Sequence, residues 1–302
     1  MLSIIIPSRS TEYLQKTIDD LLIKARGEVE VIVVLDGVWS EEPIKEDPRV
    51  RIIHHGTQFD NRGMRASINM GMALAKGDYV MKCDEHCMFD EGFDVKLAAD
   101  CEDNWVVIPR RYRLDAEKWE IVTDGRIPVD YNSVAFPYKH PKDKTDGLHG
   151  EEWKQRFYDR KDILTDSTAS CQGSCYFASR KWWFKAIGPL DDINYGPFTH
   201  EAQEVVFKSI FSGGEAMVNK KTFYCHMHKG VRGKRYNFSN AQYRKHGEEK
   251  EKGRLFTIDY WMNTKDYLPR DWVWFVEQKF PGMPGWGPNW REDITRCKEL
   301  EK

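Results

Sequence analysis

Residues 77–87, GDYVMKCDEHC, contain a largely apolar run at 79–83 that is followed by the triplet Asp84-Glu85-His86. Residues 79–83 are predicted to form a buried β-strand. Side chains alternate along a strand, so Asp84 and His86 should point to one side and Glu85 to the other. Ligands of α/β sheets bind beside the carboxyl ends of the strands. We therefore expect Asp84 and His86 to grip one divalent cation, or one of them to orient the other.

The chain around this stretch alternates between the patterns of buried strands and amphipathic helices. Strands are predicted at residues 2–7, 29–35, 50–54 and 79–83, and helices at residues 11–25 and 63–76. Such alternation is typical of a doubly wound sheet with helices on both faces. We predict an α/β fold with a Rossmann-like, mostly parallel sheet flanked by helices.

The second part of the chain is less regular. Residues 115–166 are polar and aromatic, and prolines and glycines interrupt any period. A stretch of this length inside a compact domain is typical of a functional or mobile segment. Beyond it, strands are predicted at residues 175–178 and 222–228, and helices at residues 181–187 and 201–211. The C-terminal end is rich in Trp and Pro, and we expect it to form an irregular extension.

The composition describes an ordinary soluble globular protein. Of the 302 residues, 40% are apolar and 31% are charged, and the net charge of −2 gives no bulk attraction to nucleic acid or membranes. No stretch approaches the roughly 20 apolar residues of a membrane span. We therefore expect a cytoplasmic protein without a membrane span. The seven cysteines include no Cys-x-x-Cys pair, which favours buried free thiols over a structural zinc site.

Polar side chains follow three of the predicted strands at their carboxyl ends. Ser8 and Arg9 follow the first strand, Asp36 ends the second and Asp84 follows the fourth. In a parallel sheet these ends lie side by side, so we expect one polar rim. Asp36 could accept hydrogen bonds from a base or a ribose, although an Asp-Gly pair also serves simply to make a turn.

The helix predicted from Gly63 adds two polar side chains to this rim. Arg65 and Asn69 are four residues apart and so share a helix face. A helix N-terminus also favours anions. A nucleoside diphosphate on the rim would be served by these groups; the alternative is a solvated helix face.

Four ordered motifs, IIIPSRS, VIVVLDG, NRGMRASINMG and GDYVMKCDEHC, resemble the nucleotide-binding half of GT-A glycosyltransferases of family 2. The family's helix motif commonly reads N-x-G-x-x-x-A-x-N-x-G, and Asn61, Gly63, Asn69 and Gly71 match it. The family's Asp-x-Asp is here Asp-Glu-His, which resembles the Asp-Ser-His-Cys motif of the polypeptide N-acetylgalactosaminyltransferases. Residues 200–214, HEAQEVVFKSIFSGG, show a second likeness to that group.

The resemblance implies a nucleotide-sugar site. The donor contacts that it implies are Pro7, Ser8, Arg9, Asp36, Arg65, Asn69, Asp84, Lys229 and Arg232. Asp84 and His86 would hold Mn²⁺ or Mg²⁺ on the diphosphate, together with a late histidine, His226 or in reserve His228. A divalent cation stabilises the charge that grows on the leaving diphosphate, and a histidine ligand favours Mn²⁺.

Glu201 is the candidate for the residue that faces the acceptor. In inverting members of the family a carboxylate at this position takes the proton from the attacking hydroxyl. In the polypeptide N-acetylgalactosaminyltransferases, which retain the configuration of the sugar, the matching Glu binds substrate. The alternative is that Glu201 and Glu204 are only acidic residues at a helix start, where the helix dipole favours them.

The resemblance implies a catalytic domain at residues 1–235, with a nucleotide-binding half at 1–110 and an acceptor half at 111–235. Residues 236–302 would form an aromatic and basic extension that packs on the core. The expected function is metal-dependent transfer of a sugar, which the resemblance implies to be UDP-linked, to an acceptor hydroxyl. One alternative is an acceptor among the hydroxymethylated bases of phage DNA, which the basic run at 230–254 motivates. The other is a non-catalytic module that binds nucleotide sugars.

Overall fold

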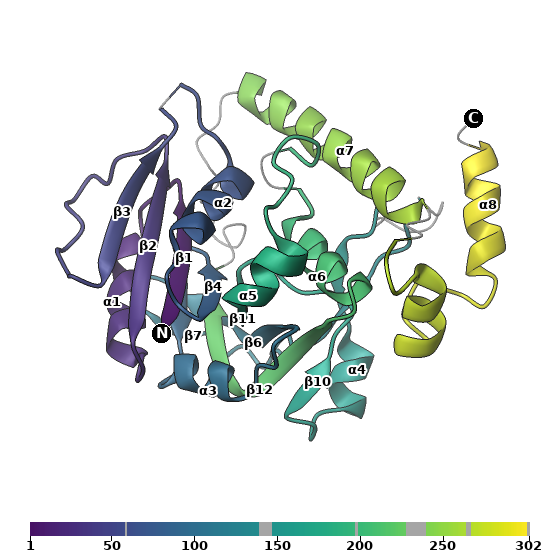
Figure 1. Cartoon of the computed structure of the whole chain (residues 1–302), viewed down its shortest axis with the longest axis horizontal. Coiled ribbons are helices and arrows are strands. Elements are labelled where there is room, and N and C mark those ends of the chain that lie inside the picture. The colour runs from purple at the N-terminus through teal and green to yellow at the C-terminus, as the bar shows by residue number, and fades with distance from the viewer. Residues whose placement is uncertain (58, 139–146, 197–198, 228–239, 264–266, 301–302) are drawn as a thin grey trace.

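The computed structural model of the chain (Figure 1) describes residues 1–57, 59–138, 147–196, 199–227, 240–263 and 267–300. Its strands are β1 (Leu2–Ser8), β2 (Val29–Asp36), β3 (Val50–His55), β4 (Tyr79–Cys83), β5 (Cys87–Phe89), β6 (Trp105–Asp115), β7 (Glu120–Ile121), β8 (Asn132–Val134), β9 (Gly150–Glu152), β10 (Thr165–Ser167), β11 (Cys175–Ser179) and β12 (Glu215–His226). Its helices are α1 (Leu14–Lys24), α2 (Met64–Leu74), α3 (Phe93–Ala99), α4 (Lys154–Asp159), α5 (Arg180–Trp182), the π-helix η1 (Trp183–Ile187), α6 (Glu201–Phe211), α7 (Asn240–Met262), the π-helix η2 (Trp274–Lys279) and α8 (Trp290–Leu300).

One large sheet organises the described part of the chain. Its strand order is β10-β12-β6-β11-β4-β1-β2-β3, with β5 added on β12 and β7 on β6. Strands β4, β1, β2 and β3 are mutually parallel, as predicted. Strand β12 is parallel to β6, while β11 runs antiparallel between β6 and β4. The α/β sheet is thus confirmed, and β11 joins its two parallel parts.

Hydrophobic side chains cover both faces of the sheet because residues alternate along each strand. Ile4 and Ile6 of β1 pack in one cluster with residues of α1 and α3. Ile5 packs in the other cluster, with residues of α2 and α6. Helix α2 approaches β1 closely at Gly71, where an added Cβ would lie 2.5 Å from a methyl carbon of Ile5. This close approach gives the glycine of the helix motif a packing reason.

The C-terminal residues belong to the second of these clusters. Trp261 of α7, Phe275 of η2 and Trp286 are buried in the same cluster as Ile5. The indole N–H of Trp286 donates to the backbone oxygen of Val134 at 2.7 Å. Helix α8 lies at the opposite end of the molecule from β3 (Figure 1). The boundary predicted at residue 235 falls outside the described residues.

Some elements differ from the sequence-based expectations. Strand β6 and helix α7 were not predicted, and the strand predicted to begin at residue 222 begins at Glu215. Helix α7 escaped the pattern because its apolar residues do not keep to one face of the helix. All seven cysteines are free thiols. Among the described residues, no helix is long and apolar enough to cross a membrane.

Candidate active site

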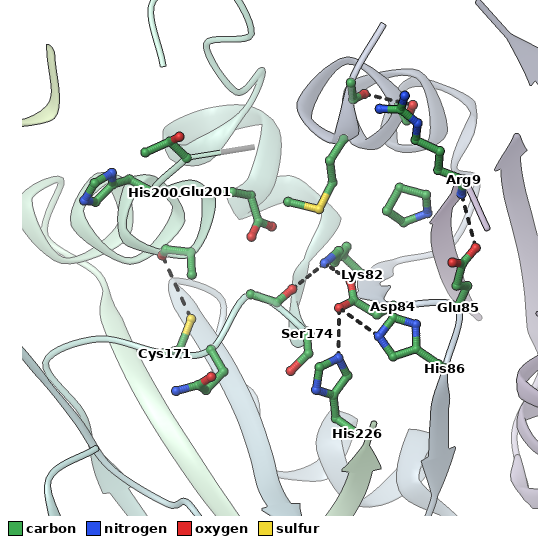
Figure 2. Close-up of a pocket in the computed structure, with 18 of the residues that line it drawn as sticks. Arg9, Lys82, Asp84, Glu85, His86, Cys171, Ser174, His200, Glu201 and His226 are labelled. Atoms are coloured by element: carbon green, nitrogen blue, oxygen red, sulfur yellow. Dashed lines mark hydrogen bonds and ion pairs between the residues drawn. The ribbon is translucent and has the colours of Figure 1, made fainter. Parts of the chain in front are cut away.

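A cavity of about 590 Å³ opens at the carboxyl ends of β1, β2 and β4 (Figure 2). On one side it is lined by the end of β1 and the start of α2, and on the other by the 171–174 segment and the start of α6. Of the predicted site residues, those that line it are Pro7, Ser8, Arg9, Asp36, Asp84, His86, Glu201 and His226. The topology therefore brings together side chains that lie up to 219 positions apart in the chain.

Asp84, His86 and His226 converge in this pocket. Each offers one possible ligand atom, and these atoms all lie within 4.8 Å of one another. Oδ2 of Asp84 lies 3.1 Å from Nε2 of His226 and 3.9 Å from Nε2 of His86. Figure 2 shows both imidazoles turned toward the carboxylate. This is the grouping that the sequence predicted, with His226 as the third member.

Strand pairing explains why these two histidines meet. The chain leaves β4, turns at residues 84–86 and enters β5, which pairs antiparallel with the end of β12. His226 lies opposite Cys87 in this register, one residue beyond His86. The Met227 N–H donates to the backbone oxygen of His86 at 3.3 Å, which holds the end of β12 against the turn.

The three side chains fit a divalent transition ion, which accepts imidazole and carboxylate ligands together. Burial lowers the pKa of His226, although the hydrogen bond to Asp84 opposes this shift. The ring is therefore neutral at pH 7, the form that binds a metal. Burial raises the pKa of Asp84, but the Lys82 ammonium and His226 outweigh it and keep that pKa below its ordinary value. Asp84 is thus ionised, the form in which a carboxylate can bind a cation.

Glu85 points away from this grouping, as strand alternation predicts. Its carboxylate accepts backbone N–H groups from Arg9, Ser10 and Thr11, each at 3.2 Å, and the hydroxyl of Ser8. Successive N–H groups that converge on a carboxylate fix the conformation of a loop. Glu85 therefore shapes the β1–α1 loop, and the hydroxyl of Ser8 is already bonded to it.

Asp36 is bonded in a similar way at the start of α2. Its two carboxylate oxygens accept the N–H groups of Arg62 and Gly63, each at 2.7 Å. Asp36 therefore does more than make the Asp-Gly turn, because it joins the end of β2 to the start of α2. The carboxylate remains at the pocket wall.

Glu201 stands across the pocket from Asp84, His86 and His226, at the first turn of α6 (Figure 2). It is buried, and its Oε1 accepts the hydroxyl of Tyr176 at 2.6 Å. Burial raises the pKa of Glu201, while the Lys82 ammonium and the Tyr176 hydroxyl partly counteract that shift. The segment at Gly173 runs so close that an added Cβ would lie 2.3 Å from Oε2 of Glu201. A carboxyl with a raised pKa inside a pocket is suited to proton transfer.

The structure places Arg65 and Asn69 away from the pocket, contrary to the donor contacts predicted for them. Arg65 is fully buried, pairs with Glu204 of α6 and donates to the backbone oxygen of Thr199. Asn69 forms two hydrogen bonds of 2.8 Å with the backbone of Leu190. Their shared helix face was predicted correctly, but that face packs against the segment before α6. Both side chains therefore hold α2 to that segment.

Three of the predicted contacts, His228, Lys229 and Arg232, lie outside the described residues. The basic run at 230–254 is described only from residue 240, as part of α7. Its Lys250 lines the pocket.

Several pocket residues were missed by the sequence reasoning. They are Lys82, Arg111, His149, Gln172 and His200. Lys82 could have been identified from the sequence, because a lysine in an otherwise apolar central strand needs a buried partner. Arg111, His149 and Gln172 lie on segments that come to the pocket only through tertiary packing, which no local pattern indicates, whereas His200 directly precedes the predicted residue Glu201.

Comparison with known proteins agrees with this architecture. The family model described as Glycosyl transferase family 2 matches residues 3–187. The chain is 29% identical over 111 residues to the uncharacterized glycosyltransferase EpsJ of Bacillus subtilis, and 28% identical over 124 residues to the glycosyltransferase GlyG of Streptococcus pneumoniae. These segments cover 34% and 38% of this chain, and 31% and 40% of the two relatives. The chain thus matches well under half the length of these relatives.

A solved structure shows the same fold over most of the chain. GalNAc-T7, crystallised with UDP, GalNAc and Mn²⁺, superposes with a TM-score of 0.64 at 16% sequence identity. The superposition covers 92% of this chain and 56% of that protein. The predicted GT-A fold is therefore confirmed.

Proposed function

Because this chain belongs to glycosyl transferase family 2, we propose that it transfers a sugar from a nucleotide-sugar donor to an acceptor hydroxyl with the help of a divalent cation. The observation that carries the proposal is the convergence of Asp84, His86 and His226 in the pocket that also holds Glu201. A cation site and a buried carboxylate on facing walls suit a reaction in which a diphosphate leaves and a hydroxyl attacks.

In this proposal the chain's residues divide the work between donor and acceptor. Asp84, His86 and His226 would hold the cation, which stabilises negative charge on the leaving diphosphate. Glu201 would face the acceptor hydroxyl and either receive its proton or orient it. The Tyr176 hydroxyl fixes one oxygen of Glu201, and the Glu201 carboxyl lines the pocket in which the acceptor would bind.

The donor would lie along the β1, β2 and α2 side of the pocket. Pro7, Ser8, Arg9 and Asp36 line that side, so they are the proposed contacts of the nucleoside and its phosphates. Lys229 and Arg232 remain proposed phosphate contacts from their sequence positions. UDP and Mn²⁺ are the donor nucleotide and cation that we propose, because GalNAc-T7 has the same fold and was crystallised with both.

The proposal is tested by incubating the protein with a panel of nucleotide sugars and MnCl₂ while measuring release of the nucleoside diphosphate. We expect release from one donor, and its loss on addition of EDTA and in His226→Gln. His54→Gln is the matched control, because His54 is exposed on β3 and does not line the pocket. Full activity in EDTA would refute the role of the cation.

The same experiment separates the alternatives. Binding of UDP with no release from any donor would favour the non-catalytic module. A DNA acceptor remains a prediction from the basic run at 230–254, much of which lies outside the described residues. Release stimulated by hydroxymethylated DNA, and not by neutral glycans, would favour it.

A further inference from the structure

Lys82 is a buried charged residue at the centre of the active site. It lies on β4, and its side chain is only 1% exposed. Its Nζ lies 2.6 Å from Oδ1 of Asp84 and also donates to the backbone oxygen of Gly173. Burying an ammonium group costs free energy unless the group is paired, so Lys82 is held where it makes both contacts.

The two carboxylate oxygens of Asp84 consequently have different partners. Oδ1 faces the Lys82 ammonium, whereas Oδ2 faces Nε2 of His226 at 3.1 Å and Nε2 of His86 at 3.9 Å. Figure 2 shows Lys82 and the two imidazoles on different sides of the carboxylate. Only Oδ2 is therefore turned toward the other two possible ligands.

The surrounding strands leave Lys82 little freedom to release Oδ1. In the antiparallel pairing of β4 with β11, Lys82 lies opposite Tyr176, so the two side chains share one face of the sheet. Tyr176 is itself held by its hydrogen bond to Glu201. The second contact of Lys82 is to the backbone oxygen of Gly173, an acceptor that, unlike a side chain, cannot rotate away.

We propose that Lys82 is a positioning residue that restricts Asp84 to one-oxygen coordination and thereby makes the site favour Mn²⁺ over Ca²⁺. The inference rests on the proposed function, because it takes Asp84, His86 and His226 to be the cation's ligands. Ca²⁺ requires six to eight oxygen ligands and commonly uses both oxygens of a carboxylate. A site with two imidazoles and a single carboxylate oxygen offers Ca²⁺ few oxygen ligands.

The test is to measure the dissociation constants of MnCl₂ and CaCl₂, without nucleotide, for the wild-type protein and Lys82→Met by calorimetry. Removing the positive charge changes the affinity for both divalent ions alike, so that effect cancels in the ratio of the two constants. Freeing Oδ1 helps Ca²⁺ selectively, and we expect the preference for Mn²⁺ to narrow by about tenfold. Arg111→Met is the matched control, because Arg111 lines the same pocket and bonds to Gln172. Its ratio should stay at the wild-type value.

An unchanged ratio in folded Lys82→Met would overturn the inference while leaving the proposed function intact. Absence of Mn²⁺ binding to the wild-type protein would overturn this inference together with the metal dependence of the proposed function. If Lys82→Met does not fold, a crystal structure of the wild-type protein with MnCl₂ gives the answer. We expect Lys82 still on Oδ1 and the ion on Oδ2; an ion bound by both oxygens would refute the role of Lys82.

Discussion

Arg65 and Glu204 form a buried ion pair, and removing Arg65 should lower the free energy of unfolding by a different amount than removing Glu204. Both side chains are 0% exposed. In Arg65→Met, Glu204 keeps the ammonium of Lys208 at 2.6 Å and the N–H of Asp191 at 3.0 Å. The carboxylate thus remains paired on one of its two oxygens.

Glu204→Gln leaves the Arg65 guanidinium in a worse position. Glu204 is the only carboxylate with which it forms an ion pair in the described part of the chain. Its other contacts there are the Thr199 carbonyl and the ring of Tyr195, whose centroid lies 4.3 Å away. Neither carries a negative charge.

Removing one partner of a buried ion pair costs about 3–5 kcal/mol. We expect Arg65→Met to lower the free energy of unfolding by an amount near the bottom of this range, and Glu204→Gln by an amount near the top. The double variant Arg65→Met/Glu204→Leu removes both charges and leaves two neutral backbone groups without a partner, the Asp191 N–H and the Thr199 carbonyl, at about 1–3 kcal/mol each. It should therefore lose less stability than the sum of the two single variants.

Urea unfolding at pH 7 measures these differences, and a titration with UDP and MnCl₂ supplies a second observable. Equal losses for the two single variants, or a double variant that loses the full sum of both, would refute the electrostatic reasoning. A stable Arg65→Met that no longer binds UDP would instead restore the donor contact predicted from the sequence.

Four further predictions concern the pocket. His226→Gln should weaken Mn²⁺ binding at least tenfold when measured by calorimetry, because losing even an outer-shell partner of a metal ligand lowers metal affinity about 10–100-fold. Asp84→Asn should lower the free energy of unfolding by about 3 kcal/mol, because it leaves the buried Lys82 without its carboxylate. Glu201→Gln should reduce kcat by about 100-fold or more if Glu201 is the base. Glu201→Gln should also unfold at a higher temperature than the wild-type protein above pH 5. The pKa of Glu201 is raised in the native state, so ionising this carboxyl lowers the stability of the wild-type protein as pH rises. A difference in unfolding temperature that closes with rising pH would contradict this. Burial lowers the pKa of His200 to about 3 from 6.5, so the unfolded chain binds the extra proton between these values. Wild-type stability should fall as pH drops from 6.5 toward 3 more steeply than that of His200→Gln, and parallel pH profiles would argue against it.

The local part of the site was predictable because strand geometry repeats every two residues. Continuing the alternation of β4 past Cys83 predicts Asp84 and His86 on one side and Glu85 on the other, and the three residues keep this arrangement in the turn between β4 and β5. The structure adds the purpose of Glu85, which binds the backbone of the β1–α1 loop. That purpose depends on β1 and β4 being neighbours, a fact of the sheet order rather than of either strand.

Arg65 shows the limit of the same reasoning. Its helix face was predicted, but periodicity cannot say what a face packs against. Its partner Glu204 lies 139 positions further along the chain, on a helix that the sheet topology carries to α2. Arg65, which was predicted to contact the phosphates, is instead buried and joins α2 to α6.

By itself, the sequence determined the alternation of strands and helices, the polar strand ends and the side to which Asp84 and His86 point. These follow from interactions between residues near one another in the chain, whose periods are readable. Only the tertiary structure decided that β5 pairs with β12 and so brings His226 to His86, and that β11 sets Tyr176 opposite Lys82. The physical reason is that strand pairing joins distant segments through backbone hydrogen bonds, which carry no mark in the sequence of either strand.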